Sequence, residues 1–124
     1  MPVKSLDSSV RKWPDKHAVH QAARTWSDRE AKRRPELMRL GYFGSYARGD
    51  WGVGSDLDLV AVVSESPLPF ETRNRDWDLN SLPVPVHLLI YTASEWHAME
   101  QEDGRFIRML RRETVWVFER RLPR

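Results

Sequence analysis

The sequence of 124 residues contains no cysteine. This absence excludes disulfide bonds, zinc sites built on thiolates and cysteine nucleophiles, and it is compatible with a reducing compartment. The sequence also has no apolar run that approaches the length of about 18 residues needed to cross a membrane. Its N-terminal stretch, MPVKSLDSSVRKWPDKH, lacks the apolar segment of a secretion signal. We therefore expect a soluble, cytoplasmic protein that is not exported and makes no membrane contact.

The length and the charge distribution narrow the class of protein further. A chain of this length can build one hydrophobic core, so we expect a single domain over residues 1–124. The net charge is only +2, but lysine and arginine concentrate in residues 1–55 and 104–124, whereas acidic residues concentrate in residues 56–103. This pattern is typical of a cation site flanked by basic surfaces that attract phosphates, RNA or an acidic partner. It is equally typical of ordinary solvated helix faces.

The spacing of apolar residues predicts an α/β domain, with a small mixed sheet of three to four strands and helices mainly on one face. Asp15 is the expected N-cap of the first helix, and Pro35 follows its end. Residues 64–83 are rich in proline and charge and form the expected connection. The expected helices cover residues 15–33, 93–101 (from near Ser94) and 103–112, with a short helical turn after Ser45. The expected strands cover residues 36–44, 57–63, 84–92 and 113–120, the last as an edge strand or a docked tail.

Two carboxylates stand at the start of the clearest buried strand, in the stretch GSYARGDWGVGSDLDLVAVV (residues 44–63). Residues i and i+2 of a strand point to the same side, so Asp56 and Asp58 are expected to lie a few ångströms apart. Like charges at that separation raise each other's pKa unless a cation lies between them. Ligand sets made only of oxygen favour Mg²⁺ or Mn²⁺ over zinc. The pair therefore predicts a divalent cation site, and a capped strand edge in an ordinary fold is the alternative.

The Gly44-Ser45 turn in the same stretch predicts a seat for phosphate. Glycine lets a backbone approach a ligand closely, the start of a helix offers N–H groups, and the serine hydroxyl is an additional donor. The alternative is that Ser45 only caps the turn. Metal-binding carboxylates beside a phosphate seat together indicate phosphoryl or nucleotidyl transfer.

This stretch resembles the signature of the polymerase-β nucleotidyltransferase superfamily, in which Gly-Ser is followed, ten residues later, by Asp-x-Asp. Ala47-Arg48-Gly49, Ser55 and the apolar run that follows add to the likeness. Within that superfamily the chain is similar to the minimal nucleotidyltransferases, small single-domain prokaryotic proteins that are often paired with a HEPN-domain protein. The resemblance covers the motif core at residues 37–63, and more loosely residues 84–118, which include the expected third strand.

The resemblance implies a role for each matching residue. Gly44 and Ser45 would bind the triphosphate of an NTP, with ATP as the expected donor, and Arg48 would support the turn or a phosphate. Asp56 and Asp58 would be the catalytic residues and would hold two metal ions, Mg²⁺ or Mn²⁺. The nucleotidyl group would pass to a hydroxyl acceptor. Because the chain has no separate domain for an acceptor, the resemblance implies a HEPN-type partner, as in toxin-antitoxin pairs, or a homo-oligomer. RNA and small molecules are the other acceptors considered.

One departure from the family pattern falls on the next strand, VPVHLLIYT, where the family usually places a third carboxylate and this chain has His87. Neutral imidazole is a poor ligand for Mg²⁺ and a weaker substitute for the carboxylate that would help deprotonate an attacking hydroxyl. His87 could serve as a ligand for Mn²⁺ or another transition metal, or Asp76 or Asp78 could fill the position. Alternatively, catalysis is lost and an antitoxin-like binding subunit remains. A histidine with only a packing or hydrogen-bonding role is the simplest interpretation.

Six tryptophans are a further prominent feature of the sequence. Aromatic rings of this size either pack in the core or stack on a base. Trp51, inside the glycine-rich loop, is the expected stacking residue. Trp26, Trp96 and Trp116 are expected in the core or at its boundary.

Overall fold

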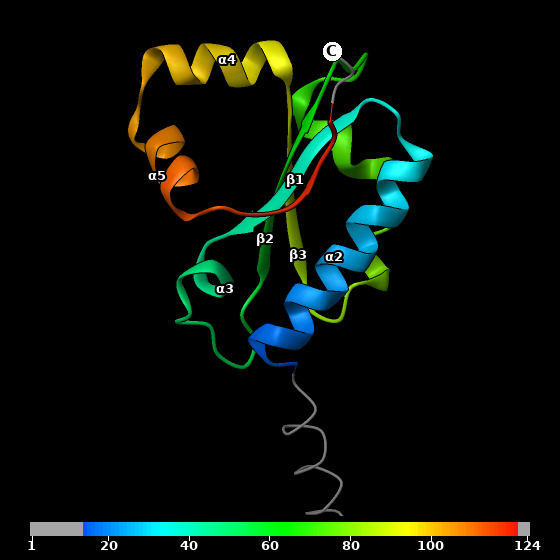
Figure 1. Cartoon of the computed structure of the whole chain (residues 1–124), viewed down its shortest axis with the longest axis vertical. Helices are drawn as coiled ribbons and strands as arrows, with labels where there is room; N and C mark the ends of the chain where they lie inside the picture. The colour runs from blue at the N-terminus through cyan, green and yellow to red at the C-terminus, as the bar shows by residue number, and fades with distance from the viewer. Residues whose placement is uncertain (1–13, 122–124) are drawn as a thin grey trace, which may run out of the picture.

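The computed structural model describes residues 14–121 and contains one four-stranded mixed sheet in the order β3-β2-β1-β4. β1 is antiparallel to both β2 and β4, whereas β3 is parallel to β2. The strands are β1 (Leu37–Phe43), β2 (Leu57–Val63), β3 (Val86–Thr92) and β4 (Val115–Glu119). The predicted α/β class and mixed sheet are therefore confirmed, and the apolar segment near the end of the chain forms the expected edge strand (Figure 1).

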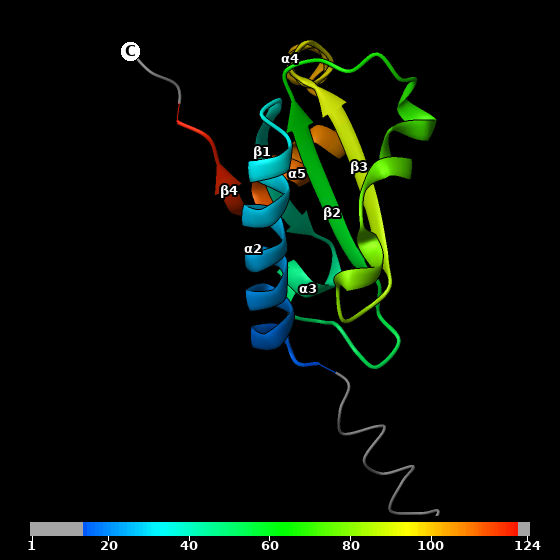
Figure 2. The same ribbon diagram turned by 90° about the vertical axis from the view of Figure 1, so that its right-hand side faces the viewer.

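Helices cover both faces of the sheet, so the expectation that they lie mainly on one face is wrong. The helices are α2 (Lys16–Arg33), α3 (Ser45–Arg48), α4 (Ala93–Glu102) and α5 (Arg105–Glu113), with short 3-10 helices η1 (Phe70–Asp76) and η2 (Leu79–Ser81). α2 packs on one face, and α4 and α5 pack on the other (Figures 1 and 2). The physical reason is that β2 is buried on both sides, and a strand of this kind needs a covering layer on each.

The side chains of β2 alternate between two separate apolar clusters. Leu57, Leu59, Ala61 and Val63 pack with α2, whereas Val60 and Val62 pack with Trp96 of α4 and with Ile107 and Leu110 of α5. Asp58 precedes Val60 by two residues and therefore points to the α4/α5 side. This alternation decides on which face the acidic side chain becomes accessible.

The ends of α2 and α4 show how local sequence sets the element boundaries. Asp15 is the N-cap of α2, as predicted, and its side chain accepts a 2.8 Å hydrogen bond from the N–H of Ala18. α4 begins at Ala93, beside the expected start near Ser94, and Thr92 is its N-cap. Thr92 and Glu95 form a reciprocal capping box, which satisfies two N–H groups at once.

The connection between β2 and β3 is tied down by one buried arginine, Arg73 of η1. Its guanidinium makes two hydrogen bonds to Glu95, of 2.6 and 3.0 Å, and one of 3.0 Å to the carbonyl of Ile90. These bonds fasten η1 to β3 and to the first turn of α4.

Within residues 14–121, no helix is both long enough and apolar enough to cross a membrane.

Candidate active site

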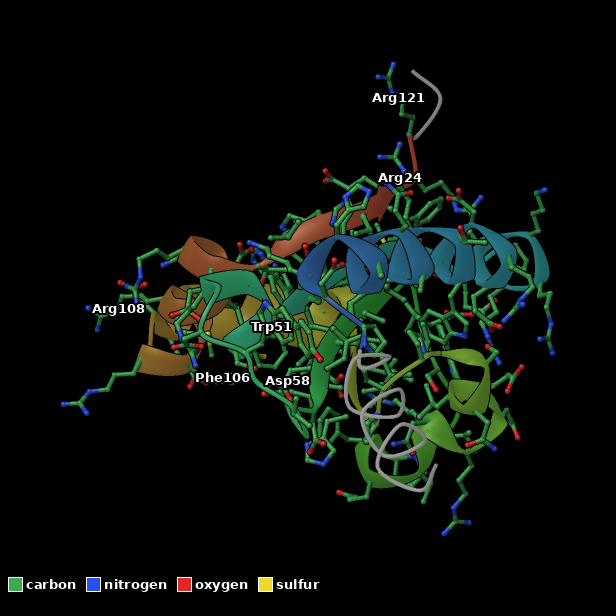
Figure 3. All side chains as sticks on the ribbon, turned by 90° about the horizontal axis from the view of Figure 1, so that it is seen from below. Arg24, Trp51, Asp58, Phe106, Arg108 and Arg121 are labelled. Carbon is green, nitrogen blue, oxygen red and sulfur yellow. The ribbon has the colours of Figure 1, made fainter. Side chains whose placement is uncertain are left out.

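The candidate site lies where β1 ends and where β2 and β3 begin. Asp58 is paired with Phe43 of β1 in the antiparallel register and with His87 of β3 in the parallel register. Residues paired across neighbouring strands point to the same side of a sheet. Asp58, Phe43 and His87 therefore share the α4/α5 face, and Asp56 immediately precedes β2. Figure 3 views this end of the molecule from below, with Asp58 near the middle of the view.

The two carboxylates have no hydrogen-bond donor from the protein among residues 14–121. The side chain of Asp58 is only 30% exposed, and burial is the main cause that raises its pKa. The charge of His87 opposes this rise, the charge of Asp56 adds to it, and the charge of Arg48 opposes it. A partly buried carboxylate that accepts no hydrogen bond from the protein has the surroundings expected of a cation ligand.

His87 lies beside both carboxylates, as the strand pairing predicts. Its Nδ1 is 3.8 Å from Oδ1 of Asp58, and its Nε2 is 3.8 Å from Oδ2 of Asp56. The ring is 74% exposed, so it is not a core histidine. Both separations exceed a hydrogen bond, so the ring nitrogens contact neither carboxylate directly.

These residues fit a metal that completes its coordination elsewhere. Among the described residues, no group of three or more histidine, aspartate or glutamate side chains is arranged to hold a metal ion by itself. Mg²⁺ is usually held by one or two carboxylates, with water and substrate phosphates as its other ligands. Asp56 and Asp58 match that set, and a role for His87 as a ligand stays a prediction.

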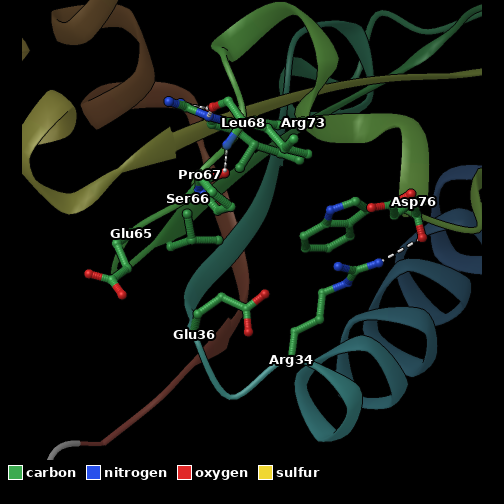
Figure 4. Close-up of a pocket in the computed structure, with 11 residues that line it drawn as sticks. Arg34, Glu36, Glu65, Ser66, Pro67, Leu68, Arg73 and Asp76 are labelled. Atoms are coloured by element: carbon green, nitrogen blue, oxygen red, sulfur yellow. Dashed lines mark hydrogen bonds between the residues drawn. The ribbon is translucent and has the colours of Figure 1, made fainter.

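Neither Asp76 nor Asp78 takes the place of the third carboxylate, so that hypothesis is wrong. Asp76 lines a cavity of about 370 Å³ with Val63, at the opposite end of β2 (Figure 4). The carboxylate of Asp78 lies 3.9 Å from Arg29 of α2, on the other face of the sheet. The connection therefore brings both residues to places remote from Asp58.

The turn between β1 and α3, where the sequence predicts a phosphate seat, lies against the carboxylate of Asp58. Gly44 is buried and has a φ of 78°, a conformation that favours glycine. A Cβ on Gly44 would overlap Oδ2 of Asp58, so the missing side chain leaves the space that the carboxylate occupies. Gly44 is also the N-cap of α3, so the alternative that Ser45 only caps the turn is wrong. The hydroxyl of Ser45 makes no hydrogen bond to any residue in 14–121 and is available to a ligand.

Arg48 supports the turn through two carboxylates of the protein. Its Nε donates to Asp50 at 3.1 Å, and its Nη1 donates to Glu113 at 3.4 Å. The second bond fastens α3 to the last residue of α5. The predicted support of the turn therefore has a structural basis, and a contact of Arg48 with phosphate stays a prediction.

Two aromatic residues near the site differ from expectation. Trp51 stacks on Tyr46, with ring centroids 5.5 Å apart and planes at 10°, and both belong with the cluster on the α2 side. Phe106 of α5, which the sequence analysis did not single out, contacts Phe43 edge-on with centroids 6.1 Å apart. No local signal identifies Phe106, because its place depends on how α5 packs. Trp26 and Trp96 are buried, and Trp116 is partly buried, as predicted.

The sequence and the fold of this chain are similar to those of known proteins. The family model described as "Nucleotidyltransferase domain" matches residues 28–121. The crystal structure of a "putative nucleotidyltransferase from Sulfolobus solfataricus" has a TM-score of 0.60 at 19% identity, with 85% of this chain and 84% of that chain covered. A crystal structure described as "the toxin-antitoxin with AMP-PNP" has a TM-score of 0.48 at 12% identity, with 78% and 73% covered.

A search of curated proteins found no match. The family match spans most of the chain and includes the Gly-Ser turn, both aspartates and His87. The structural likeness to the Sulfolobus solfataricus protein supports the same fold. The chain therefore belongs to the nucleotidyltransferase domain family, within the polymerase-β superfamily.

Proposed function

We propose that this protein is a metal-dependent nucleotidyltransferase that moves a nucleotidyl group from an NTP, with ATP as the expected donor, to a hydroxyl acceptor. One observation carries the proposal. The carboxylates of Asp56 and Asp58 receive no hydrogen bond from the described protein, and the Gly44-Ser45 turn lies directly against Asp58. A divalent cation and the phosphates that accompany it would supply the missing counter-charge.

Each residue of the site would have a distinct role in the reaction. Asp56 and Asp58 would hold Mg²⁺ or Mn²⁺, which when bound neutralises phosphate charge and makes the attacking hydroxyl more acidic. The hydroxyl of Ser45 would donate a hydrogen bond to a phosphate oxygen, and Arg48 would keep the turn in place through Asp50 and Glu113.

The reaction balances without a further reagent. The acceptor oxygen forms a bond to the α-phosphorus, while the bond from that phosphorus to the oxygen bridging to the β-phosphorus breaks. Pyrophosphate leaves with the bonding electrons, and the hydroxyl proton passes to a nearby base. His87, whose ring nitrogens lie 3.8 Å from a carboxylate oxygen of Asp56 and of Asp58, is the candidate for that base.

The acceptor is proposed to be presented by another molecule. The described residues form one domain around a single sheet, and larger nucleotidyltransferases use a separate domain for this purpose. Family resemblance favours a HEPN-type protein, as in toxin-antitoxin pairs, with a second copy of the chain or an RNA as other sources of the hydroxyl.

A second candidate function rests on His87. An exposed imidazole stands where the family usually has a carboxylate, which weakens both the binding of Mg²⁺ and the removal of a proton. The protein would then be a catalytically weak or inactive nucleotidyltransferase fold that acts as a binding subunit for a HEPN-domain protein.

One labelling experiment separates the two candidates. The purified protein is incubated with NTPs labelled at the α-phosphate, with Mg²⁺ or Mn²⁺, and with or without a candidate HEPN-domain partner. We expect label transfer that is lost in Asp56→Asn and Asp58→Asn. Asp28→Asn, an exposed aspartate on α2, is the matched control and keeps the transfer. No transfer with either metal, together with a stable complex with the partner, contradicts the enzyme and supports the binding subunit.

A further inference from the structure

We propose that Phe106 is the platform on which the base of the bound nucleotide stacks. This inference deepens the proposed function and rests on it, because it requires an NTP at the Gly44-Ser45 turn. The supporting observation is an exposed aromatic ring on the same face of the sheet as Asp58, in contact with Phe43, the strand partner of Asp58.

The position of Phe106 follows from one ring contact and one strand pairing. Its ring lies 6.1 Å from the ring of Phe43, and Phe43 is the direct strand partner of Asp58. Because paired residues of neighbouring strands lie about 5 Å apart, Phe106 is on the order of 10 Å from the Asp58 carboxylate. That separation leaves room for a ribose between a phosphate at the metal site and a base on the ring.

The ring is also accessible. Phe106 is 40% exposed, although it is a large apolar side chain. The planes of Phe106 and Phe43 meet at 85°, so this contact uses an edge of one ring and leaves at least one face of Phe106 uncovered. Within residues 14–121, no other aromatic ring and no cationic side chain stacks on it.

The helix that carries Phe106 is held in place on the site. Ile107 and Leu110 are buried in the cluster with Val60, and Glu113 accepts a hydrogen bond from Arg48. Phe106 and Glu113 are seven residues apart, so they lie on one face of α5, about 10 Å along its axis. That face therefore runs from the support of the phosphate turn to the proposed base platform. In Figure 3, which looks along the long axis of the molecule, Phe106 and Asp58 lie near each other in projection.

Trp51 is a weaker candidate for the same role. One face of its indole is covered by Tyr46, and both rings pack with the α2-side cluster, away from the face that carries Asp58. Stacking on a phenyl ring uses only the flat surface of a base and tolerates any base. We therefore expect little discrimination among nucleotides, with purines bound more tightly than pyrimidines because their rings are larger.

The test compares a ligand that has a base with one that has none. Binding of α,β-methylene-ATP and of inorganic tripolyphosphate, each with Mg²⁺, is measured by calorimetry. Phe106→Leu, which keeps an apolar contact with Phe43, and Phe106→Ala are expected to weaken binding of the ATP analogue about tenfold. Binding of tripolyphosphate is expected to stay unchanged, and Phe106→Trp is expected to bind the ATP analogue at least as tightly as the natural protein.

Phe70→Leu is the matched control, because Phe70 is 37% exposed but lies on η1 beside Tyr91. It should alter neither affinity. Equal loss of both ligands in Phe106→Leu, or loss of neither, overturns the base platform and leaves the proposed function standing. If the natural protein binds neither ligand, both the platform and the proposed function fail. Unchanged affinity for tripolyphosphate also shows that the variants are folded.

Discussion

The carboxylate of Asp58 occupies the space that the Cβ of any other residue at position 44 would fill. The glycine of the Gly-Ser motif therefore has two roles: it adopts a φ of 78°, and it makes room for the acidic side chain on the neighbouring strand. The Gly44-Ser45 turn and Asp58 are consequently one packed unit and cannot be altered independently.

We expect Gly44→Ala to abolish most of the activity. The added Cβ would displace the Asp58 carboxylate, and a misplacement of about 1 Å in an active site can lower the rate about 100-fold. Gly49→Ala is the matched control. Gly49 also has a positive φ, of 88°, but a Cβ there would meet nothing within 4 Å.

Both variants carry the backbone strain of a positive φ, which costs roughly 1 kcal/mol of stability. Label transfer and thermal unfolding of the two proteins are compared side by side. Equal transfer rates in Gly44→Ala and Gly49→Ala would show that the overlap with Asp58 has no catalytic consequence.

Asp58→Asn should stabilise the free protein at pH 7 while it removes activity. Burial raises the pKa of Asp58 above its ordinary value of 3.8, so the folded state binds the proton more tightly than the unfolded state. The stability of the natural protein therefore falls as the pH rises through 3.8 towards the raised pKa, and stays lower above it.

Asparagine carries no charge, so we expect Asp58→Asn to melt a few degrees above the natural protein at pH 7. This difference should vanish below pH 3.8, where Asp58 is also uncharged. Melting curves from pH 3 to 8 measure this difference, with Asp28→Asn as the exposed control. Addition of Mg²⁺ and ATP should stabilise the natural protein and not Asp58→Asn. A melting temperature that falls at pH 7 in Asp58→Asn would contradict the proposed lack of a counter-charge.

His87→Asp should shift the metal preference of the label transfer towards Mg²⁺. A carboxylate at this position restores an oxygen ligand, and we expect the rate with Mg²⁺, relative to Mn²⁺, to rise at least about tenfold. Without metal, the third negative charge beside Asp56 and Asp58 should lower the melting temperature. His97→Asp, on the exposed side of α4, should change neither quantity. An unchanged ratio of the two rates would mean that position 87 takes no part in metal binding.

Glu95→Gln should destabilise the fold more at neutral pH than in acid. Hydrogen bonds from Arg73 lower the pKa of Glu95 to about 2, so its ionised form favours the folded state. This contribution is fully present above the ordinary pKa of 4.5 and is lost as the pH falls towards 2. Because Glu95 is partly exposed, we expect a loss of about 1–2 kcal/mol at pH 7.

Urea unfolding at pH 7 and at pH 3 measures this difference. Glu100→Gln, on the same helix and without an ion pair, is the control. A loss of equal size at both pH values would show that the charge of Glu95 is not the cause.

Much of the site is encoded locally and follows from the sequence. The alternation of LDLVAVV predicts strand β2, and the period of two places Asp56 and Asp58 on one side of it. The family resemblance drew attention to His87 on the next strand, and the structure pairs His87 with Asp58 across β2 and β3. These features depend on residues within one strand or between neighbouring strands.

Other features depend on contacts between segments far apart in the chain. That helices cover both faces, that Asp76 and Asp78 end remote from Asp58, and that Phe106 lies beside Phe43 are results of packing. A local pattern shows that a helix has an apolar side but does not show which layer will cover it. The sequence by itself therefore determined the Gly-Ser and Asp-x-Asp motif and the metal and phosphate roles predicted for it. Only the tertiary structure decided which aromatic ring lies on the face of Asp58, because that depends on how α5 docks on the sheet.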